Sequence, residues 1–310
     1  EGICSMTLSP RTFISVVILF IIFLFSDSLT SPVCCKVNHF EKKYHIYCYF
    51  CKKKKALKIY FLGTGTSQGI PVIGSKHSVC LSSDSKDKRL RVSVWIETEE
   101  ASIVIDCGPD FRQQMLTSKC ERIDALLFTH EHADHTAGLD DIRPFYFQQG
   151  DIEVYAHQRV LKNLSKRFDY IFENENKYPG APSVSTNEVV NSQSFFVKNT
   201  EVIPIDALHG NLQVFGYRIQ DFVYLTDVKT INQTEIDKIK NCKILVINCL
   251  REEPHATHFN LEEALHFISL VQPKETYLTH ISHVFGFHEE IQQKLPKNVF
   301  VAYDNLIINS

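Results

Sequence analysis

The sequence predicts an α/β protein, a layered sandwich that follows an N-terminal extension resembling a signal or transit segment. The 310 residues are 44% hydrophobic and 22% charged, which is the composition of an ordinary folded protein. From Leu57 onward, short runs rich in β-branched and aromatic residues are interleaved with helical segments, whereas the preceding residues show no such order. We therefore divide the chain into an extension, residues 1–57, and a body, residues 58–310.

The extension contains an apolar run, residues 13–25, in which Ser15 is the only polar residue. Its length and its polar flanks are those of a signal-peptide core, and it is shorter than the ~18 residues of a confident membrane span. This predicts a destination in the secretory pathway or in an organelle reached through it. Three alternatives stay open: a buried core helix, an uncleaved anchor that contacts the membrane through residues 13–25, and a cytoplasmic location.

Basic residues and cysteines dominate the rest of the extension. Residues 1–57 hold eight Lys or Arg against three acidic residues, and they contain five of the ten cysteines. A transit segment and a zinc site made of Cys34, Cys35, Cys48 and Cys51 are both compatible with this pattern. The body has 25 basic and 33 acidic residues, and this acidic balance argues against tight, sequence-independent binding of nucleic acid.

The elements of the body follow from hydrophobic periodicity. Strands are predicted at 58–62, 91–97, 102–106, 124–128, 152–156, 201–205, 216–219, 222–225, 243–247, 276–278 and 299–302. Helices are predicted at 160–168, 234–240, 261–271 and 289–295. The third helix is the clearest, because Asn260 precedes it as an N-cap and two glutamates occupy its first turn. Two sheet-rich halves with interleaved helices are typical of a layered sandwich.

A cluster of metal-binding residue types follows the strand predicted at 124–128. The segment reads Thr-His-Glu-His-Ala-Asp-His, so that His130, His132, Asp134 and His135 lie within six residues. His130 and His132 can point the same way on an extended or turning backbone, whereas the neighbours Asp134 and His135 diverge. This spacing favours two metal ions, one held by each pair.

This H-x-H-x-D-H segment resembles the signature of the metallo-β-lactamase-fold hydrolases. The chain looks closest to the branch of the PhnP-like phosphoribosyl cyclic phosphate phosphodiesterases, which is similar over the opening segment 61–74, FLGTGTSQGIPVIG, and over 135–144, HTAGLDDIRP. The resemblance covers residues 58 to about 308. It implies a four-layer αββα sandwich that binds two divalent ions, Zn²⁺ or Mn²⁺.

The resemblance also implies the remaining site residues, each of which follows a predicted strand. His209 would complete the site of His130 and His132, His280 would complete the site of Asp134 and His135, and Asp227 would bridge both ions. In such a centre a metal-bridging hydroxide attacks phosphorus, and Asp134 helps to orient it. His258, favoured over His255, would supply the proton for the leaving group.

Two further sets of residues are suggested beside the main site. Asp106 ends a predicted strand and is a candidate for fixing the tautomer of a ligand histidine, or else an Asx-turn residue. Related proteins often hold a structural zinc with three cysteines and a histidine. Ser75, His77, Cys80 and His283 stand at these positions here, so the resemblance implies a third, weaker site of His77, Cys80 and His283. The alternative is that both histidines are surface-loop residues.

The sequence thus predicts a metal-dependent phosphoric diester hydrolase that acts on a small cyclic phosphate or nucleotide-like ester. A tRNA 3′-processing endonuclease shares the same site but would need an RNA-binding arm, for which residues 136–208 offer little basic sequence. Two further functions stay open, a thioester or lactone hydrolase on the same fold and a non-catalytic binding protein. Neither the oligomeric state nor the natural substrate follows from the sequence.

Overall fold

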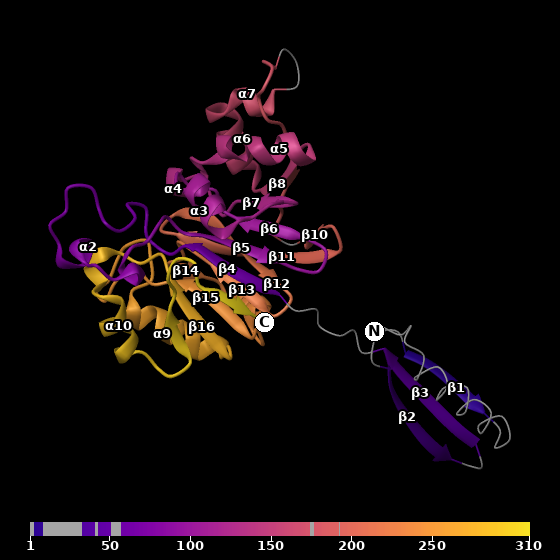
Figure 1. Ribbon diagram of the computed structural model, residues 1–310. Helices are drawn as coiled ribbons and strands as arrows, with labels where there is room; N and C mark the ends of the chain where they lie inside the picture. The colour runs from indigo at the N-terminus through magenta and orange to yellow at the C-terminus, as the bar shows by residue number, and fades with distance from the viewer. Residues whose placement is uncertain (1–2, 9–32, 41–42, 51–56, 174–176, 192) are drawn as a thin grey trace. The chain divides into compact units, whose positions relative to one another are not determined.

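The computed structural model describes residues 3–8, 33–40, 43–50, 57–173, 177–191 and 193–310 (Figure 1). The chain divides into two compact units, Glu1–Lys55 and Ala56–Ser310. The described ranges of the first unit form an antiparallel sheet of β1 (Ile3–Leu8), β3 (Lys43–Phe50) and β2 (Val33–Phe40), in that order. No strand is predicted there from the sequence, because the basic and cysteine-rich composition resembles a targeting segment.

The apolar run 13–25 lies outside the described residues, so the signal segment and the destination stay predictions. Cys51 and the lysines at 52–55 lie outside them as well. Among the residues that are described, none of the helices is both long enough and apolar enough to cross a membrane.

Strands from both ends of the second unit make up what we call the first sheet. In the described part of the chain its order is β18-β4-β5-β6-β7-β8-β9. The bounds are β4 (Lys58–Gly63), β5 (Ser93–Glu97), β6 (Ser102–Ile105), β7 (Ala125–Leu127), β8 (Ile152–Ala156), β9 (Val184–Glu188) and β18 (Ile307–Asn309). The strands from β6 to β9 are parallel.

The second sheet has the order β10-β11-β12-β13-β15-β16-β17 among the described residues, with β14 paired to β11. The bounds are β10 (Phe195–Val197), β11 (Thr200–His209), β12 (Leu212–Ile219), β13 (Phe222–Leu225), β14 (Thr230–Ile231), β15 (Ile244–Asn248), β16 (Glu275–Thr279) and β17 (Val299–Val301). The neighbouring strands β13, β15, β16 and β17 are parallel.

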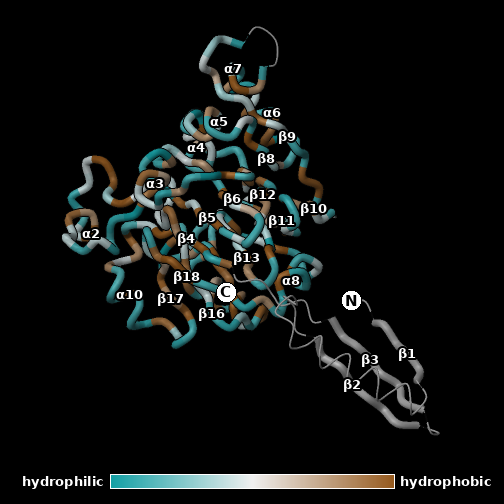
Figure 2. Tube along the Cα trace, turned by 45° about the vertical axis from the view of Figure 1, so that its right-hand side comes forward, coloured by the Kyte–Doolittle hydropathy of each residue, from teal (hydrophilic) through white to brown (hydrophobic). Residues whose placement is uncertain are grey.

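Hydrophobic side chains from both sheets fill the space between them. Phe61 and Ile105 of the first sheet belong to the same buried cluster as Phe215, Tyr217 and Tyr224 of the second. Because successive strand residues point to opposite faces, each sheet also has an apolar outer face that another layer must cover. Figure 2 shows hydrophobic stretches along the strands in the interior of this unit.

Helices cover both outer faces. The outer face of the first sheet packs against α3 (Phe111–Ser118), α5 (Arg143–Gln149), α6 (Gln158–Arg167) and α7 (Asp169–Phe172). The outer face of the second sheet packs against α8 (Gln233–Ile239), α9 (Leu261–Val271) and α10 (His288–Lys294). The short helices α2 (Ser78–Leu81) and α4 (Ala133–Thr136) lie in loops. The layers run helix, sheet, sheet, helix (Figure 1), and the predicted α/β class is confirmed.

The polar residues expected at the site lie at the ends of strands from both sheets. Asp106 follows β6 and the His130 segment follows β7 in the first sheet, whereas Asp227 follows β13 and His280 follows β16 in the second. The carboxyl ends of neighbouring parallel strands meet at one edge of a sheet, and ligands commonly bind there.

Candidate metal centre

The loop that follows β7 is held tightly against the segment that follows β6. The backbone N–H of Cys107 donates to the carbonyl of His135 at 2.7 Å, and the N–H of Gly138 donates to the carbonyl of Cys107 at 2.9 Å. A Cβ atom on Gly108 would lie 2.0 Å from the carbonyl oxygen of Asp134. Only glycine therefore permits this approach, which fixes the backbone that carries the four clustered residues.

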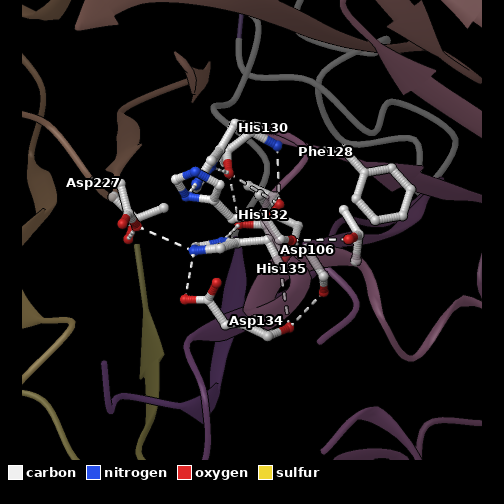
Figure 3. Close-up of polar contacts among 12 residues, drawn as sticks. Asp106, Phe128, His130, His132, Asp134, His135 and Asp227 are labelled. Atoms are coloured by element: carbon white, nitrogen blue, oxygen red, sulfur yellow. Dashed lines mark hydrogen bonds and ion pairs between the residues drawn. The ribbon is translucent and has the colours of Figure 1, made fainter. Parts of the chain in front are cut away.

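The first group of candidate ligands consists of His130, His132 and His209, whose ring nitrogens lie within 4.8 Å of one another. His130 Nε2 is 2.9 Å from His132 Nδ1 (Figure 3). His209 Nδ1 is 2.8 Å from the carbonyl oxygen of Thr257. Because a carbonyl only accepts, His209 carries its proton on Nδ1 and its Nε2 is free to bind a cation.

The second group consists of Asp134, His135 and His280. His135 Nε2 is 3.3 Å from Asp134 Oδ2, and His280 Nε2 is 3.9 Å from the same oxygen. Both Nε2 atoms are buried and have no hydrogen-bond partner among the described residues. Asp106 Oδ2 is 2.6 Å from His135 Nδ1, which holds the proton there and leaves Nε2 as a free donor of electrons. This contact is the one that the sequence suggested for Asp106.

The carboxylate of Asp227 faces both groups. Its Oδ2 is 3.2 Å from His135 Nε2, and its Oδ1 is 3.3 Å from His280 Nε2 and 4.0 Å from His209 Nε2. Thr226 donates its hydroxyl proton to Oδ2 at 2.7 Å, which fixes the carboxylate. Figure 3 shows Asp227 pointing toward His135 from the side of the second sheet. Every residue suggested for the two metal ions thus converges, although their assignment as ligands stays a prediction.

His258 lies against the same carboxylate. Its Nε2 is 3.0 Å from Asp227 Oδ1, and its ring stacks on that of His280. His255 lies behind it, with an Nδ1-to-Nδ1 distance of 3.1 Å, and is partly exposed. Of the two histidines that the sequence offered, His258 is the one in contact with Asp227.

Burial and mutual charge set the protonation of the group. Burial alone would raise the pKa of Asp227, but His280 and His135 outweigh it and hold that pKa well below its usual range. The pKa of Asp134 is lowered in the same way, against the effect of burial, by His135. Burial lowers the pKa of His130, with a further contribution from His135, and burial also lowers the pKa of His209. Ionised carboxylates and neutral imidazoles are the forms that bind metal ions.

The residues present fit divalent cations. The donor set is imidazole nitrogen and carboxylate oxygen, which Zn²⁺ and Mn²⁺ both accept. Three carboxylates, those of Asp106, Asp134 and Asp227, lie around His135. Burial opposes the protonation of His135, but these carboxylates outweigh burial and raise the pKa of His135 well above its usual value. A cation beside the orphaned Nε2 atoms would satisfy both the imidazoles and the excess negative charge.

The third set of residues is less complete. The rings of His77 and His283 lie edge to face with centroids 5.1 Å apart, and His283 Nδ1 is buried without a hydrogen-bond partner among the described residues. His77 Nδ1 accepts the N–H of Val79, and Cys80 Sγ accepts the N–H of Val72. The part of the chain that the structure describes brings no third ligand within reach of these histidines to form a group like the first two. The third site stays a prediction.

Several residues that hold the ligands were not predicted. Thr226 orients Asp227, and the carbonyl of Thr257 orients His209. Thr226 could have been suspected because it directly precedes Asp227 in the sequence. Thr257 carries no such signal, because it contacts His209 from 48 residues away and through a backbone carbonyl.

Comparisons with known proteins agree with this geometry. Residues 101–281 match the family model described as Beta-lactamase superfamily domain. A crystal structure of a new diphosphatase from the PhnP family is 35% identical and superposes with a TM-score of 0.77, covering 82% of this chain and 97% of that one.

Two curated relatives match over part of their length. An octanoyltransferase of Porphyromonas gingivalis (strain ATCC BAA-308 / W83) is 40% identical over 252 residues, which are 81% of this chain and 51% of that protein. A ribonuclease Z of Bacillus subtilis (strain 168) is 28% identical over 170 residues, which are 53% of this chain and 49% of that protein. The chain thus spans about half the length of these curated relatives.

The family match covers more than half of the chain, and the diphosphatase is aligned over nearly its whole length. The resemblance drawn from the H-x-H-x-D-H segment is confirmed. The chain belongs to the beta-lactamase superfamily, within the PhnP family of metal-dependent hydrolases.

Proposed function

We propose that this chain hydrolyses phosphoric diesters at a dinuclear metal centre, and that its substrate is a small cyclic phosphate or nucleotide-like ester. The observation that carries the proposal is the position of Asp227. One carboxylate lies within 3.3 Å of both His135 and His280 and within 4.0 Å of His209, so it joins the two ligand groups.

The chain offers three ligands to each ion and one shared by both. His130, His132 and His209 would hold the first ion, Asp134, His135 and His280 the second, and Asp227 would bridge them. Bound divalent ions supply two kinds of chemistry, because they lower the pKa of water and neutralise the oxygens of a phosphoryl group. The choice between Zn²⁺ and Mn²⁺ is not fixed by this donor set.

The residues around the ligands orient the reaction. The ionised Asp227 accepts a hydrogen bond from His258, so the His258 proton lies on Nε2 and faces the centre. When the ring also carries a proton on Nδ1, the Nε2 proton can pass to the leaving alkoxide of a diester and leave a neutral imidazole, since proton transfer needs a donor within hydrogen-bond reach. Burial lowers the pKa of His258, although the hydrogen bond with Asp227 opposes this effect. The lowered pKa makes protonated His258 a stronger acid.

RNA 3′-end processing is the second candidate, and the match to a ribonuclease Z supports it. Against it stands the acidic balance of residues 58–310, because RNA contacts need basic surface. Acyl-ester or thioester hydrolysis on the same fold is a third reaction to compare.

A substrate panel tests the proposal. The purified chain with Zn²⁺ or Mn²⁺ is compared on a cyclic phosphate, a linear diester, a precursor tRNA and a thioester. We expect turnover of the small diesters, and a loss of about 10² to 10⁴-fold in His258→Ala with the metal content unchanged. His266→Ala is the matched control, because His266 is an exposed histidine of the adjoining α9. Inertness toward every diester with either metal, or activity on the thioester alone, would overturn the proposal.

A further inference from the structure

The first turn of α6 contacts both chain segments that carry the first ligand group. Arg159 donates from Nε to Glu131 Oε1 at 2.8 Å and from Nη2 to the carbonyl of Gln213 at 2.6 Å. Glu131 lies between His130 and His132 in the sequence. Gln213 pairs with Leu208, the residue before His209, across β11 and β12. A single guanidinium thus joins the His130–His132 loop to the strand pair that presents His209.

This junction matters because the first group draws its ligands from two different sheets. Two other hydrogen bonds cross it, from the N–H of Phe215 to the carbonyl of Thr129 at 3.0 Å and from the hydroxyl of Tyr217 to the carbonyl of Phe128 at 2.7 Å. Both bonds hold the chain just before His130. Arg159 instead contacts Glu131, which lies between the two histidines in the sequence.

The cap of α6 fixes the backbone of Arg159. The backbone N–H of Arg159 donates to His157 Nδ1 at 3.0 Å, which caps the start of α6. The Nε and Nη2 groups form one rigid planar fork, so the two acceptors are fixed relative to each other. The Arg159 side chain is 35% exposed, and ion pairs this accessible add little to global stability. The contact therefore matters mainly because it fixes Glu131 and the Gln213 carbonyl relative to each other, and little because of its contribution to the free energy of unfolding.

The last turn of α6 contacts the same loop. Arg167 donates to Thr136 Oγ1 at 2.7 Å, and Thr136 in turn donates to the carbonyl of His132 at 2.8 Å. Arg167 also approaches the carbonyl of Glu131 at 3.3 Å. Both ends of α6 thus bind the segment that carries His130 and His132.

We propose that Arg159 is a positioning residue that sets the separation between His209 and the His130–His132 pair, and so the affinity of the first metal site. The inference rests on the proposed dinuclear centre. Residues that orient metal ligands without touching the metal typically change its affinity by about 10 to 100-fold. The second group, Asp134, His135 and His280, has no contact with Arg159 among those described, so its affinity is expected to stay unchanged.

A metal titration tests this without any activity assay. The full chain, stripped of metal, is titrated with Zn²⁺ against a chromogenic chelator, and His209→Gln and His280→Gln identify which binding step belongs to which site. We expect Arg159→Ala to weaken the first site by about 10 to 100-fold and to leave the second within about twofold. Arg159→Lys should recover part of the loss, because an ammonium can pair with Glu131 but does not reproduce the fork. Lys162→Ala is the control, since Lys162 is exposed on the same helix and its ammonium donates to Gln158, one turn earlier, and not to the loop of His130 and His132.

A double-variant cycle separates positioning from general damage. If Arg159 acts through Glu131, then Arg159→Ala with Glu131→Gln should bind Zn²⁺ no more weakly than Arg159→Ala. Unchanged affinity in Arg159→Ala, or equal weakening of both sites, would overturn the inference and leave the proposed centre intact. Failure of the unaltered chain to bind two ions would instead overturn the proposed function. Should Arg159→Ala not fold, Arg159→Lys and Glu131→Gln carry the same test.

Discussion

Three single residues at the centre adopt a backbone conformation that side chains disfavour. Asp106, Asp227 and His280 have φ angles of 63°, 58° and 59°. Such left-handed conformations cost of order 1 kcal/mol or more for residues with a Cβ, and they concentrate at functional sites. Each of these residues follows the end of a strand and turns its side chain to the ligand cluster. The chain thus adopts an unfavourable backbone conformation at these three residues, and in return their side chains are placed at the centre.

At the same scale, Asp106→Asn tests how a ligand is oriented. The Asp106 carboxylate is 2.6 Å from His135 Nδ1 and also accepts the N–H and hydroxyl of Thr129, so it fixes the ring and makes Nε2 more basic. An amide keeps the shape but removes the charge. We expect the second metal site to lose about 10 to 100-fold in affinity, measured by chelator competition. Unaltered affinity in a folded Asp106→Asn protein would show that the charge is not needed.

The residues of the centre differ in how far sequence could identify them. His130, His132, Asp134 and His135 stand together after one strand, and their spacing alone predicted two metal sites. His209, Asp227 and His280 are separated from them by about 70 residues or more, so spacing says nothing about their position and only the family resemblance suggested them. Arg159 carried no signal at all, because its role depends on two tertiary contacts.

At the scale of elements, α9 illustrates how a helix start positions the segment before it. Asn260 accepts the N–H of Glu263, and Glu263 accepts the N–H of Asn260, which together form a capping box. Asn260 Nδ2 also donates to the carbonyl of Glu252 at 2.9 Å. This bond closes the loop of residues 252–260, which contains His258.

We therefore expect Asn260→Ala to lower the free energy of unfolding by about 0.5 to 2 kcal/mol, because the cap is lost. Urea unfolding followed by circular dichroism measures this value. Glu262→Gln is the control, since Glu262 is exposed in the same first turn and has no capping contact among the described residues. Equal stability of Asn260→Ala and Glu262→Gln would contradict the role assigned to the cap.

Elements with a clear hydrophobic pattern could be predicted, whereas polar ones could not. The helices α6, α8, α9 and α10 and the strands β8 and β13 lie within about two residues of their predicted bounds. Length does not explain why α3 and α5 were missed, because α8 and α10 are no longer than they are. In α5, Pro144 stands in the first turn, and a proline in a sequence is commonly read as the end of a helix. The strand β9 reads VSTNE and was missed because it is polar and lies at the edge of the first sheet.

At the scale of the whole molecule, a buried polar network ties the segment of residues 82–90 to the C-terminal part of the chain. Arg89 is buried and donates to Thr64 Oγ1 at 2.8 Å, and its Nη2 lies 3.3 Å from His288 Nδ1. Asp304 accepts the N–H of Leu90, and Asp87 accepts the N–H of His288. Burial, with Arg89 and Lys86, lowers the pKa of His288 to about 4.

The lowered pKa predicts a dependence of stability on pH. Between pH 6.5 and about 4 the unfolded chain protonates His288 and the folded chain does not, so acid favours unfolding. Asp304 acts in the opposite direction, because burial raises its pKa to about 6 and the folded chain then binds the extra proton. The difference between the unaltered chain and His288→Gln isolates the histidine. We expect this difference in the free energy of unfolding to shrink as pH falls from 7 to 4.5, and a constant difference would refute the assignment.

Metal removal should act on the whole fold, because the ligands join both sheets. His130, His132, Asp134 and His135 extend from the first sheet, whereas His209, Asp227 and His280 extend from the second. An ion that binds only the folded chain stabilises it by about 2.7 kcal/mol at a free concentration 100 times its dissociation constant. We expect a chelator to lower the melting temperature by several degrees, and added Zn²⁺ or Mn²⁺ to restore it in proportion to the logarithm of its concentration. Asp227→Asn should show a smaller response, since the residue that joins the two groups no longer carries charge. A melting temperature that is independent of chelator and of added metal would mean that the two sheets are not linked through ions.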